Sequence, residues 1–463
     1  MHLYFPIFNE DELNLIFTKY INSERVHINY LQAILDTTSS ELLLTDEIRL
    51  LALQKINSEQ KKLFNKNTGM KFGSIVGFGD FKEVKSFKNN GTEFTFQYDT
   101  KWIKGNLDFP TLLNNFIYLF EFVDSQMRFQ NVSKPTELGL FENLFGVHTK
   151  YEYKTGMMFK VKEMTLLMQM MQYERELLKN KSSIEKCISW FYKNYLKQEF
   201  AISDFLVHMP KPSVMSFEKC RIIFPEIDGI LKQFSIYQKL KKIDHDLMEV
   251  STSSVPFENI KSLNVKKYVY VDEEKTAKLF HLLFSDQSTM HYIEGYEKYN
   301  TFFDLITNEK IKYNAIKKNQ EDDFMWLKKN GYIKRNKNGF IEFKDIVMIY
   351  ILKDLYENEV ISYMHYPIQY QKRVDYLVKK NLCYFDNHLF SKPEVKYLNF
   401  YLNNRMVSNG LSLRNRYGHG TQPRKDNKKV HDNNYLYLLY IIVLITIKIN
   451  DDLCLFDENN KHK

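Results

Sequence analysis

The stretch from Tyr435 to Ile449, YLYLLYIIVLITIKI, is a nearly uninterrupted apolar run near the carboxyl end of the chain. Its β-branched residues favour a strand, whereas its length of about fifteen residues favours a helix, and we expect a helix. The run is shorter than the roughly 20 residues that cross a bilayer. It also contains Lys448 and meets Asp451 and Asp452. We therefore predict a buried core helix.

Length and composition describe a large globular protein. The chain has 463 residues, which exceeds one ordinary core and predicts roughly two to four domains. Hydrophobic residues make up 44% and charged residues 26%, values that lie within the soluble range and far from disorder. The net charge of +8 permits a nucleic-acid partner without requiring one. The 4 cysteines form no CxxC pair, so neither a zinc ribbon nor a disulfide framework is indicated.

The chain is predicted to be mainly α-helical and multidomain, with a small sheet near its N-terminal end. The first 66 residues and residues 159–180 carry apolar residues at helical spacing. Between them, alternating apolar positions flank Asn89-Asn90-Gly91, a strong hairpin signal. The polar stretch from Ser251 to Pro256 is the best candidate for an interdomain linker. We predict four regions: an N-terminal α+β region at 1–150, a helical middle region at 151–256, a connecting region with a wing-like ribbon at 257–343, and a C-terminal helical bundle with short β-ribbons at 344–463.

Two features that can mark binding sites have simpler interpretations. The glycines Gly73, Gly77 and Gly79 could form a phosphate cradle, but no GK[ST] sequence follows, so we assign them to turns and bulges. The 159–180 helix has one broad apolar face, made of Met164, Leu167, Met168, Met171 and Leu178. Methionine-rich faces more often fill cores than bind partners, so we expect this face to be buried.

A weak internal duplication follows the linker. The segments WLKKNGYIKRNKNGFIEF, from Trp326, and LVKKNLCYFDNHLFSKPE, from Leu377, each join a helix end to a turn and a second apolar segment. Each predicts a helix followed by a β-ribbon, as in winged-helix modules. One interpretation is DNA contact through a basic cluster, Lys328, Lys329, Lys334 and Arg335. We favour the other, a protein-interaction or scaffold ribbon with a solvated basic edge, because no distinct recognition-helix cluster precedes either ribbon.

The main candidate site is LRNRYGHG, from Leu413 to Gly420. Apolar residues upstream, up to Met406, predict a helix that stops at Asn409-Gly410, so the stretch lies between two helices. The guanidinium of Arg414 can hold a scissile phosphate and stabilise its developing charge. The imidazole of His419 titrates near neutrality, so it can remove a ribose 2′-hydroxyl proton or protonate the leaving oxygen without a metal ion.

This stretch resembles the HEPN superfamily, whose ribonucleases carry an arginine and a histidine separated by four to six residues, commonly with a polar residue directly after the arginine. In this chain those positions are Arg414, Asn415 and His419, and the resemblance covers roughly residues 344–463. It implies a helical bundle that cleaves RNA by 2′-hydroxyl attack with no cofactor. The products would be a 2′,3′-cyclic phosphate and a free 5′-hydroxyl. The resemblance also implies an antiphage, abortive-infection or toxin effector, with a possible phage-derived trigger or regulatory partner.

RNA binding and assembly follow from this hypothesis. Basic residues in the motif and on a predicted polar loop after it are expected to contact RNA phosphates: Arg416 in the motif, and Arg424, Lys425, Lys428 and Lys429 on the loop. We expect two chains to form a homodimer through the C-terminal domain. The His419 side chains of the two chains would then face each other and could share the two proton transfers. The apolar 435–449 helix could offer one face to that partner, or it could be completely buried within its own chain. The sequence start, MHLYFPIFNEDELN, lacks a secretory signal, so we expect a cytoplasmic protein with no membrane partner.

Other assignments compete with this one. A second arginine and histidine with a permitted spacing, Arg424 and His431, lack the flanking residues and helices that surround Arg414 and His419. A metal-dependent phosphohydrolase would use His208, His245-Asp246 and Asp304, a weak pattern in a chain with 12 histidines. The main rival is a noncatalytic protein that binds nucleic acid or another protein through the winged-helix-like elements.

Overall fold

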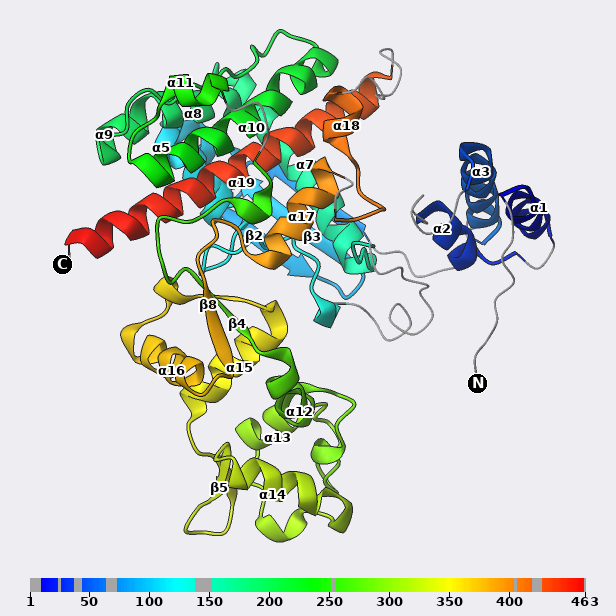
Figure 1. The fold of residues 1–463 in the computed structure, drawn as a ribbon, viewed down its shortest axis with the longest axis vertical. Coiled ribbons are helices and arrows are strands. Elements are labelled where there is room, and N and C mark those ends of the chain that lie inside the picture. Colours follow the sequence, from blue (N-terminus) through cyan, green and yellow to red (C-terminus); the bar gives the residue numbers. More distant parts are fainter. Residues whose placement is uncertain are drawn as a thin grey trace.

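The computed structural model describes residues 10–23, 26–36, 44–63, 73–137, 152–250, 255–403, 406–418 and 427–461. It confirms a mainly helical, multidomain chain with small sheets (Figure 1). Three main hydrophobic clusters define an N-terminal unit (10–63), a body (73–263 with 389–461) and an inserted unit (268–386). The body therefore combines segments on both sides of the inserted unit. The four predicted regions have other boundaries and stay a prediction.

The N-terminal unit and the sheet that follows it agree with the local sequence patterns. Helices form where apolar spacing predicts them, at α1 (Glu10–Ile21), α2 (Ile28–Asp36) and α3 (Asp46–Leu63). The sheet has the order β1-β3-β2, with β1 (Gly73–Gly79), β2 (Lys85–Asn89) and β3 (Glu93–Asp99). The predicted hairpin is confirmed, because β2 and β3 pair antiparallel and the Gly91 N–H donates to Asn89 Oδ1 at 2.8 Å.

The assignment of the three glycines to turns was wrong. Gly73, Gly77 and Gly79 lie in β1, which pairs parallel with β3. The Phe81 ring lies close over this strand, and a Cβ at Gly79 would stand 3.3 Å from two of its atoms. Gly77 and Gly79 thus leave room for the Phe81 ring beside the strand, a role that local spacing does not reveal, whereas a Cβ at Gly73 would have no neighbour within 4 Å.

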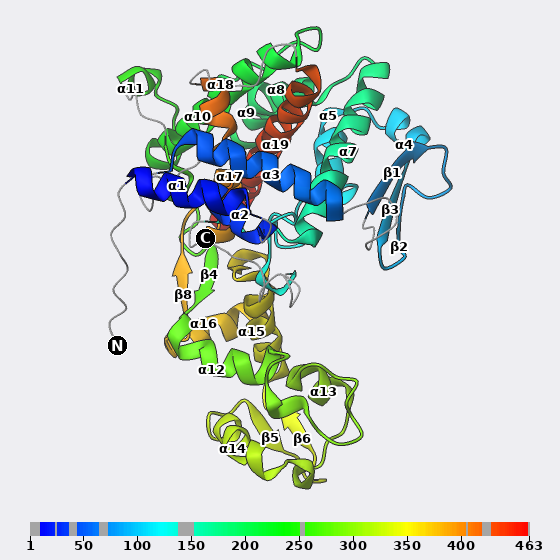
Figure 2. The ribbon, with the colours of Figure 1, turned by 90° about the vertical axis from the view of Figure 1, so that its right-hand side faces the viewer.

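The body is a helical assembly around one long helix (Figure 1). Its helices are α4 (Thr100–Gly105), α5 (Phe109–Tyr118), α7 (Met157–Lys179), α8 (Ile184–Trp190), α9 (Leu196–Phe200), α10 (Ser216–Leu240), α11 (His245–Val250), α17 (Lys392–Leu402), α18 (Leu413–Gly418) and α19 (Lys428–Lys461). The sheet lies at the edge of the body against α7 (Figure 2), where Gln172 Nε2 donates to the Val76 carbonyl at 2.7 Å. Residues 251–254 of the expected linker lie outside the described residues.

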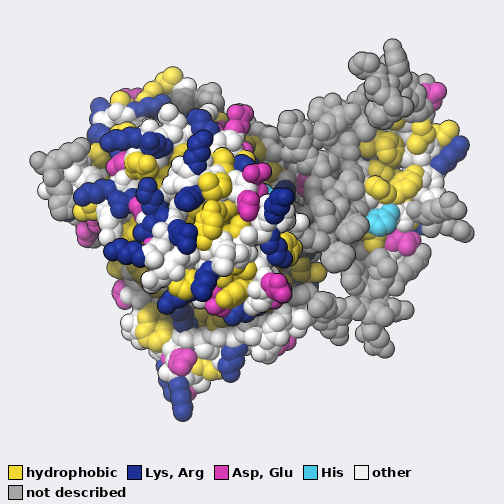
Figure 3. Space-filling view, turned by 90° about the horizontal axis from the view of Figure 1, so that it is seen from below, with side chains coloured by type: hydrophobic (Ala, Val, Ile, Leu, Met, Phe, Trp, Pro, Cys, Tyr) yellow, Lys and Arg dark blue, Asp and Glu magenta, His cyan; other side chains and the backbone are white. Residues whose placement is uncertain are grey.

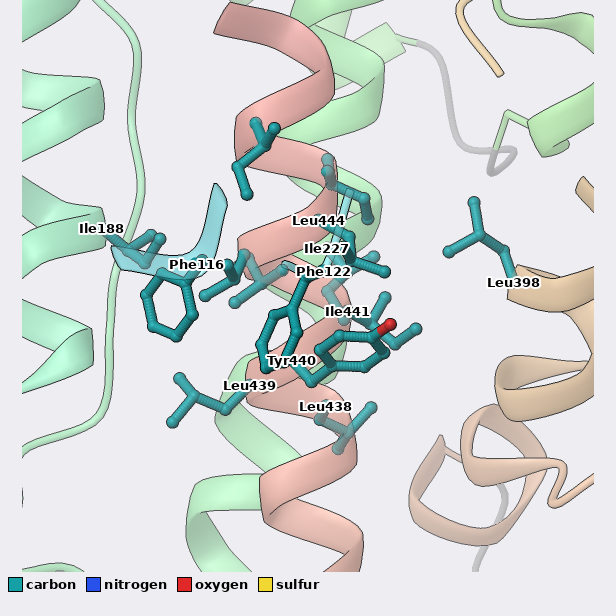
Figure 4. Close-up of a cluster of buried hydrophobic side chains, with 14 of the residues drawn as sticks. Phe116, Phe122, Ile188, Ile227, Leu398, Leu438, Leu439, Tyr440, Ile441 and Leu444 are labelled. Carbon is teal, nitrogen blue, oxygen red and sulfur yellow. The ribbon is translucent and has the colours of Figure 1, made fainter. Parts of the chain in front are cut away.

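Helix α19 confirms the expected core helix and occupies the centre of the body. Every side chain from Leu438 to Ile445 is 0% exposed, and the rings of Phe116 and Phe122 lie beside the helix, with Phe122 against its Tyr440 (Figure 4). Helix prevails over the local β-branched preference because all faces of the segment are covered by other elements of the body. The run Tyr435–Ile449 therefore packs within its own chain, and Tyr437 alone in the run is partly exposed.

The apolar face predicted for α7 was only partly right. The helix is present, but Met164, Met171 and Leu178 are each about two-fifths exposed, whereas Leu166 and Tyr173 are buried. The buried side also carries polar residues, which the apolar spacing does not count. Thr165 and Gln169 lie there because β1 and β3 supply their hydrogen-bond partners, Ser74 and Tyr98. The buried face of α7 is thus the face that packs against the sheet, and it is not the face that carries the methionines.

The inserted unit contains both halves of the internal duplication. Its elements are β4 (Tyr268–Val271), α12 (Glu273–Phe284), α13 (Phe302–Asn308), α14 (Glu321–Lys329), β5 (Ile333–Arg335), β6 (Ile341–Phe343), α15 (Ile346–Asn358), β7 (Ile361–Ser362), α16 (Ile368–Lys379) and β8 (Cys383–Asp386). The first half ends in the predicted ribbon, β5 paired with β6. In the second half β8 pairs with β4 instead, so its ribbon partner comes from the start of the unit.

Buried charges join the inserted unit to α19. Nζ of Lys267, the residue directly before β4 of the inserted unit, lies 2.5 Å from the Asp452 carboxylate, and His365 Nε2 lies 2.8 Å from Asp451. Within the body, Lys448 on the same helix pairs with Glu394 at 2.8 Å. Burial raises the pKa of Asp451, but the His365 hydrogen bond and the Lys267 charge outweigh it and hold the pKa below its usual value. Removing one partner would leave an uncompensated buried charge, so these pairs hold the two units in one arrangement.

Two further findings concern the chain as a whole. In the part of the chain that the structure describes, no helix has both the length and the hydropathy of a membrane-crossing segment. All 4 cysteines are free thiols, and Cys187, Cys220 and Cys383 are buried. Burial raises the pKa of the Cys383 thiol to about 12, so it stays protonated and unreactive at neutral pH.

Candidate active site

The chain reaches the candidate motif through a tight return from α17. That helix ends at Leu402, earlier than the predicted stop at Asn409-Gly410, because Asn403 leaves the helical conformation. Gly410 has another role. The following Leu411 N–H donates to the Phe400 carbonyl at 2.7 Å, and a Cβ at Gly410 would lie 2.5 Å from that oxygen. Only glycine allows the segment to approach α17 so closely.

Helix α18 is anchored on its inner side by Leu413 and Tyr417, both of which are buried. The Tyr417 hydroxyl lies 2.7 Å from His431 Nδ1 and accepts a hydrogen bond from Asn434 Nδ2 at 2.9 Å. Both partners belong to the first turns of α19. The tyrosine of the RNRYGH stretch is therefore a structural contact that sets α18 against the core helix. Arg414, Asn415 and Arg416 are only partly buried.

Arg414 is held by two residues of α10. Its Nη2 lies 2.7 Å from Asp228 Oδ2, and its guanidinium lies over the Phe224 ring, 5.4 Å from the centroid. Its side chain is 28% exposed at the edge of a small hollow of about 40 Å³, which Asn399 and Asn403 also line. Burial raises the pKa of Asp228, and the Arg414 charge only partly opposes that effect. The guanidinium is thus oriented and still reachable from solvent.

The other predicted site residues fall into two groups. His419, Arg424 and Lys425 lie outside the described residues. Lys428 and Lys429, expected on a polar loop, instead form the first turn of α19, and both are exposed. The helix extends farther toward its N-terminus than the apolar run indicated because its first turn includes polar residues such as His431, which is buried against Tyr417 and Phe217.

The structure also bears on the competing assignments. His431, the histidine of the second spacing match, is 1% exposed and serves as a buried contact of α18. The phosphohydrolase pattern is not assembled, because no group of three or more His, Cys, Asp or Glu side chains gathers as metal ligands in the described ranges. Instead, His208 pairs with Glu226 on α10, whereas Asp304 belongs to α13 of the inserted unit.

Sequence reasoning missed Asp228 and Phe224. They precede Arg414 by almost 190 positions, and each has the appearance of an ordinary residue of an amphipathic helix. Their role follows from the packing of α10 against α18 and α19, which no local pattern specifies. Searches against protein-family models, curated proteins and solved structures find no match to this chain. The candidate site is therefore supported by the chain's own residues alone.

Proposed function

We propose that the chain is a metal-independent endoribonuclease of the HEPN type, with Arg414, Asn415 and His419 as its catalytic residues. The observation that carries the proposal is the oriented, solvent-reachable guanidinium of Arg414 within an Arg-Asn-x-x-x-His run beside the core helix. An arginine with a purely structural role would have its guanidinium N–H donors engaged by other groups of the protein. Here the Asp228 ion pair engages Nη2, and a guanidinium has five N–H donors in all.

The proposed chemistry divides between a fixed charge and a titrating group. Arg414 would contact the scissile phosphate and stabilise the extra negative charge of the transition state. His419 would take the 2′-hydroxyl proton or deliver a proton to the 5′-oxygen. The attack yields a 2′,3′-cyclic phosphate and a 5′-hydroxyl, and needs no metal ion. Arg416 and the exposed Lys428 and Lys429 would contribute RNA affinity through phosphate contacts.

The test is cleavage of total RNA by the purified protein in EDTA, followed by mapping of the product ends. We expect cyclic phosphate ends, and we expect His419→Ala to abolish them while the melting temperature is retained. His208→Ala is the matched control, because His208 is an exposed histidine whose side chain is 78% accessible. Cleavage by the folded His419→Ala variant at the wild-type rate would remove His419 from the mechanism.

The biological setting is part of the same proposal. A chain that cuts cellular RNA would act as an abortive-infection, antiphage or toxin effector, under the control of a trigger or an antagonist. Expression of the wild-type chain should then arrest growth, whereas expression of His419→Ala should not. Equal growth arrest by both chains, at equal protein levels, would show that the toxicity does not depend on RNA cleavage.

A further inference from the structure

The two halves of the inserted unit repeat one local structure. After α14, the N–H groups of Asn330, Gly331 and Tyr332 bond the carbonyls of Trp326, Lys328 and Leu327 at 3.0 Å each. After α16, those of Lys380, Asn381 and Leu382 bond Tyr376, Val378 and Leu377 at 2.9–3.0 Å. Gly331 and Asn381 both have positive φ, at 78° and 54°. The match places α14 and α16 in register, with Leu327 equivalent to Leu377.

This register reveals opposite charges on the two equivalent helices. Lys372 and Arg373 of α16 stand where α14 has Asp322 and Asp323. On α14 this face is also partly covered, because Asp323 pairs with Lys278 of α12 at 2.9 Å. The two halves thus share a structure but differ in the surface that they present, and only α16 presents a cationic helix.

Apart from Ile368 in the first turn, which is 71% exposed, the exposed residues on and directly after α16 form one polar and cationic face: Gln369, Lys372, Arg373, Tyr376, Lys379 and Lys380. Their spacing of three or four residues places them on the same side of the helix, opposite the buried Val374 and Leu377. These residues precede β8, a strand whose partner, β4, lies more than a hundred residues earlier.

This face borders a groove of about 900 Å³, whose other wall comes from the end of α14 and the start of α15. Both acids in its lining are already engaged. Asp345 lies 2.5 Å from Arg373 Nε, and Asp375 binds Lys266 and the Tyr363 hydroxyl, each at 3.1 Å. The lysines of the lining, Lys344, Lys372, Lys379 and Lys380, form no ion pair with any described residue. Figure 3 views this end of the molecule and shows Lys and Arg side chains spread over it.

We propose that this cationic face binds double-stranded DNA, with α16 as the helix that enters the major groove. The major groove of B-form DNA is about 12 Å wide and admits an α-helix, whereas the major groove of an RNA duplex is too narrow for side chains to read. Gln369 and Arg373 are residue types that read base edges, and the lysines around them suit phosphates. This site lies in the inserted unit, apart from Arg414, so its test is independent of the proposed nuclease.

The experiment measures anisotropy of a labelled DNA duplex of mixed sequence, with duplex RNA and single-stranded DNA as parallel probes. All proteins carry His419→Ala, so that RNA probes stay intact. We expect duplex DNA to bind most tightly, and Lys372→Glu with Lys380→Glu to weaken it about tenfold or more. The slope of log affinity against log salt should fall by about 1.8, because each lost phosphate contact removes about 0.9.

Three further double variants make the result specific. Lys193→Glu with Lys197→Glu makes the same charge change at exposed positions of the body and should leave DNA affinity unchanged. Lys372→Arg with Lys380→Arg keeps the charge and should keep the affinity. The neutral pair Lys372→Gln with Lys380→Gln is measured as well, and should lose affinity even if charge reversal disturbs folding. Unchanged DNA affinity in the folded neutral pair, or tighter binding of either other probe through the same lysines, overturns the proposal.

Discussion

At the scale of single residues, the candidate site depends on how Arg414 is held. Asp228 fixes one edge of the guanidinium and Phe224 supports its plane. An ammonium group in the same place could pair with Asp228, but it would lack the planar fork that fits a phosphate. For the proposed phosphate contact, the planar shape and orientation of the Arg414 guanidinium therefore matter more than its positive charge alone.

Arg414→Lys should lower kcat for RNA cleavage by about 10²-fold, the usual cost of losing an oriented donor in a transition state. The melting temperature should change little. Steady-state kinetics on a short RNA gives the comparison, and Arg221→Lys is the control, because Arg221 lies on the same helix as Asp228 with a side chain that is 56% exposed. A fully active Arg414→Lys enzyme would exclude Arg414 from the site.

Glu163 should make stability depend on pH. Burial raises its pKa from 4.5 to about 7, although Tyr401 and Tyr397 donate hydrogen bonds to its carboxylate. Between pH 4.5 and about 7 the folded chain keeps a proton that the unfolded chain has lost, so stability falls as pH rises through this window. The loss is complete above the folded pKa.

Urea unfolding of wild type and Glu163→Gln at pH 5 and pH 8 measures this effect. The difference in unfolding free energy between the two proteins should shift by a few kcal/mol in favour of Glu163→Gln at the higher pH, because the amide stays neutral throughout. Comparing the two proteins removes the contribution of Glu174, whose pKa burial also raises to about 7. An equal pH dependence in both would show that Glu163 does not titrate in this range.

At the scale of elements, α19 carries both the packing of the body and its buried charges. Lys448→Met should destabilise the protein by about 3–5 kcal/mol, because it leaves the Glu394 carboxylate unpaired in the core. Adding Glu394→Gln should recover part of that loss, since an amide needs no counter-charge. Lys461→Met is the control at the exposed end of the same helix, where the solvated ion pair with Asp457 should contribute little to stability. Urea unfolding that shows no recovery in the double variant would contradict this account.

Elements were predictable where short-range patterns determine them. The hairpin follows from Asn89-Asn90-Gly91, and α19 follows from the length of its apolar run. The β4–β8 pair and the Asp228 contact were not predictable, because each joins residues that are distant in sequence. At the candidate site, the sequence alone pointed to Arg414 and His419. It could not show what orients Arg414, and it misplaced Lys428 and Lys429 on a loop.

At the scale of the whole molecule, assembly is the open question that the nuclease proposal raises. One chain contributes one His419, whereas the reaction needs both a base and an acid. The core position of α19 means that a homodimer would use other surfaces of the C-terminal part than the Tyr435–Ile449 run.

Light scattering should show a homodimer. Mixing His419→Ala chains with wild-type chains, after exchange of subunits, should lower RNA cleavage below simple dilution, because mixed dimers carry a single His419. The control mixes His208→Ala with wild type and should show no loss. A fully active monomer, with strictly linear loss on mixing, would rule out a shared site.

A ribosome must translate the whole inserted unit before it reaches α19. Domains generally fold as units while the chain is being made, and the residues of the inserted cluster, up to Cys383, are complete long before residue 428. The body core cannot form until α19 has emerged, and Tyr417 lacks its partner His431 until then. A chain that cuts RNA would therefore acquire its folded site only after both the inserted unit and α19 have been translated.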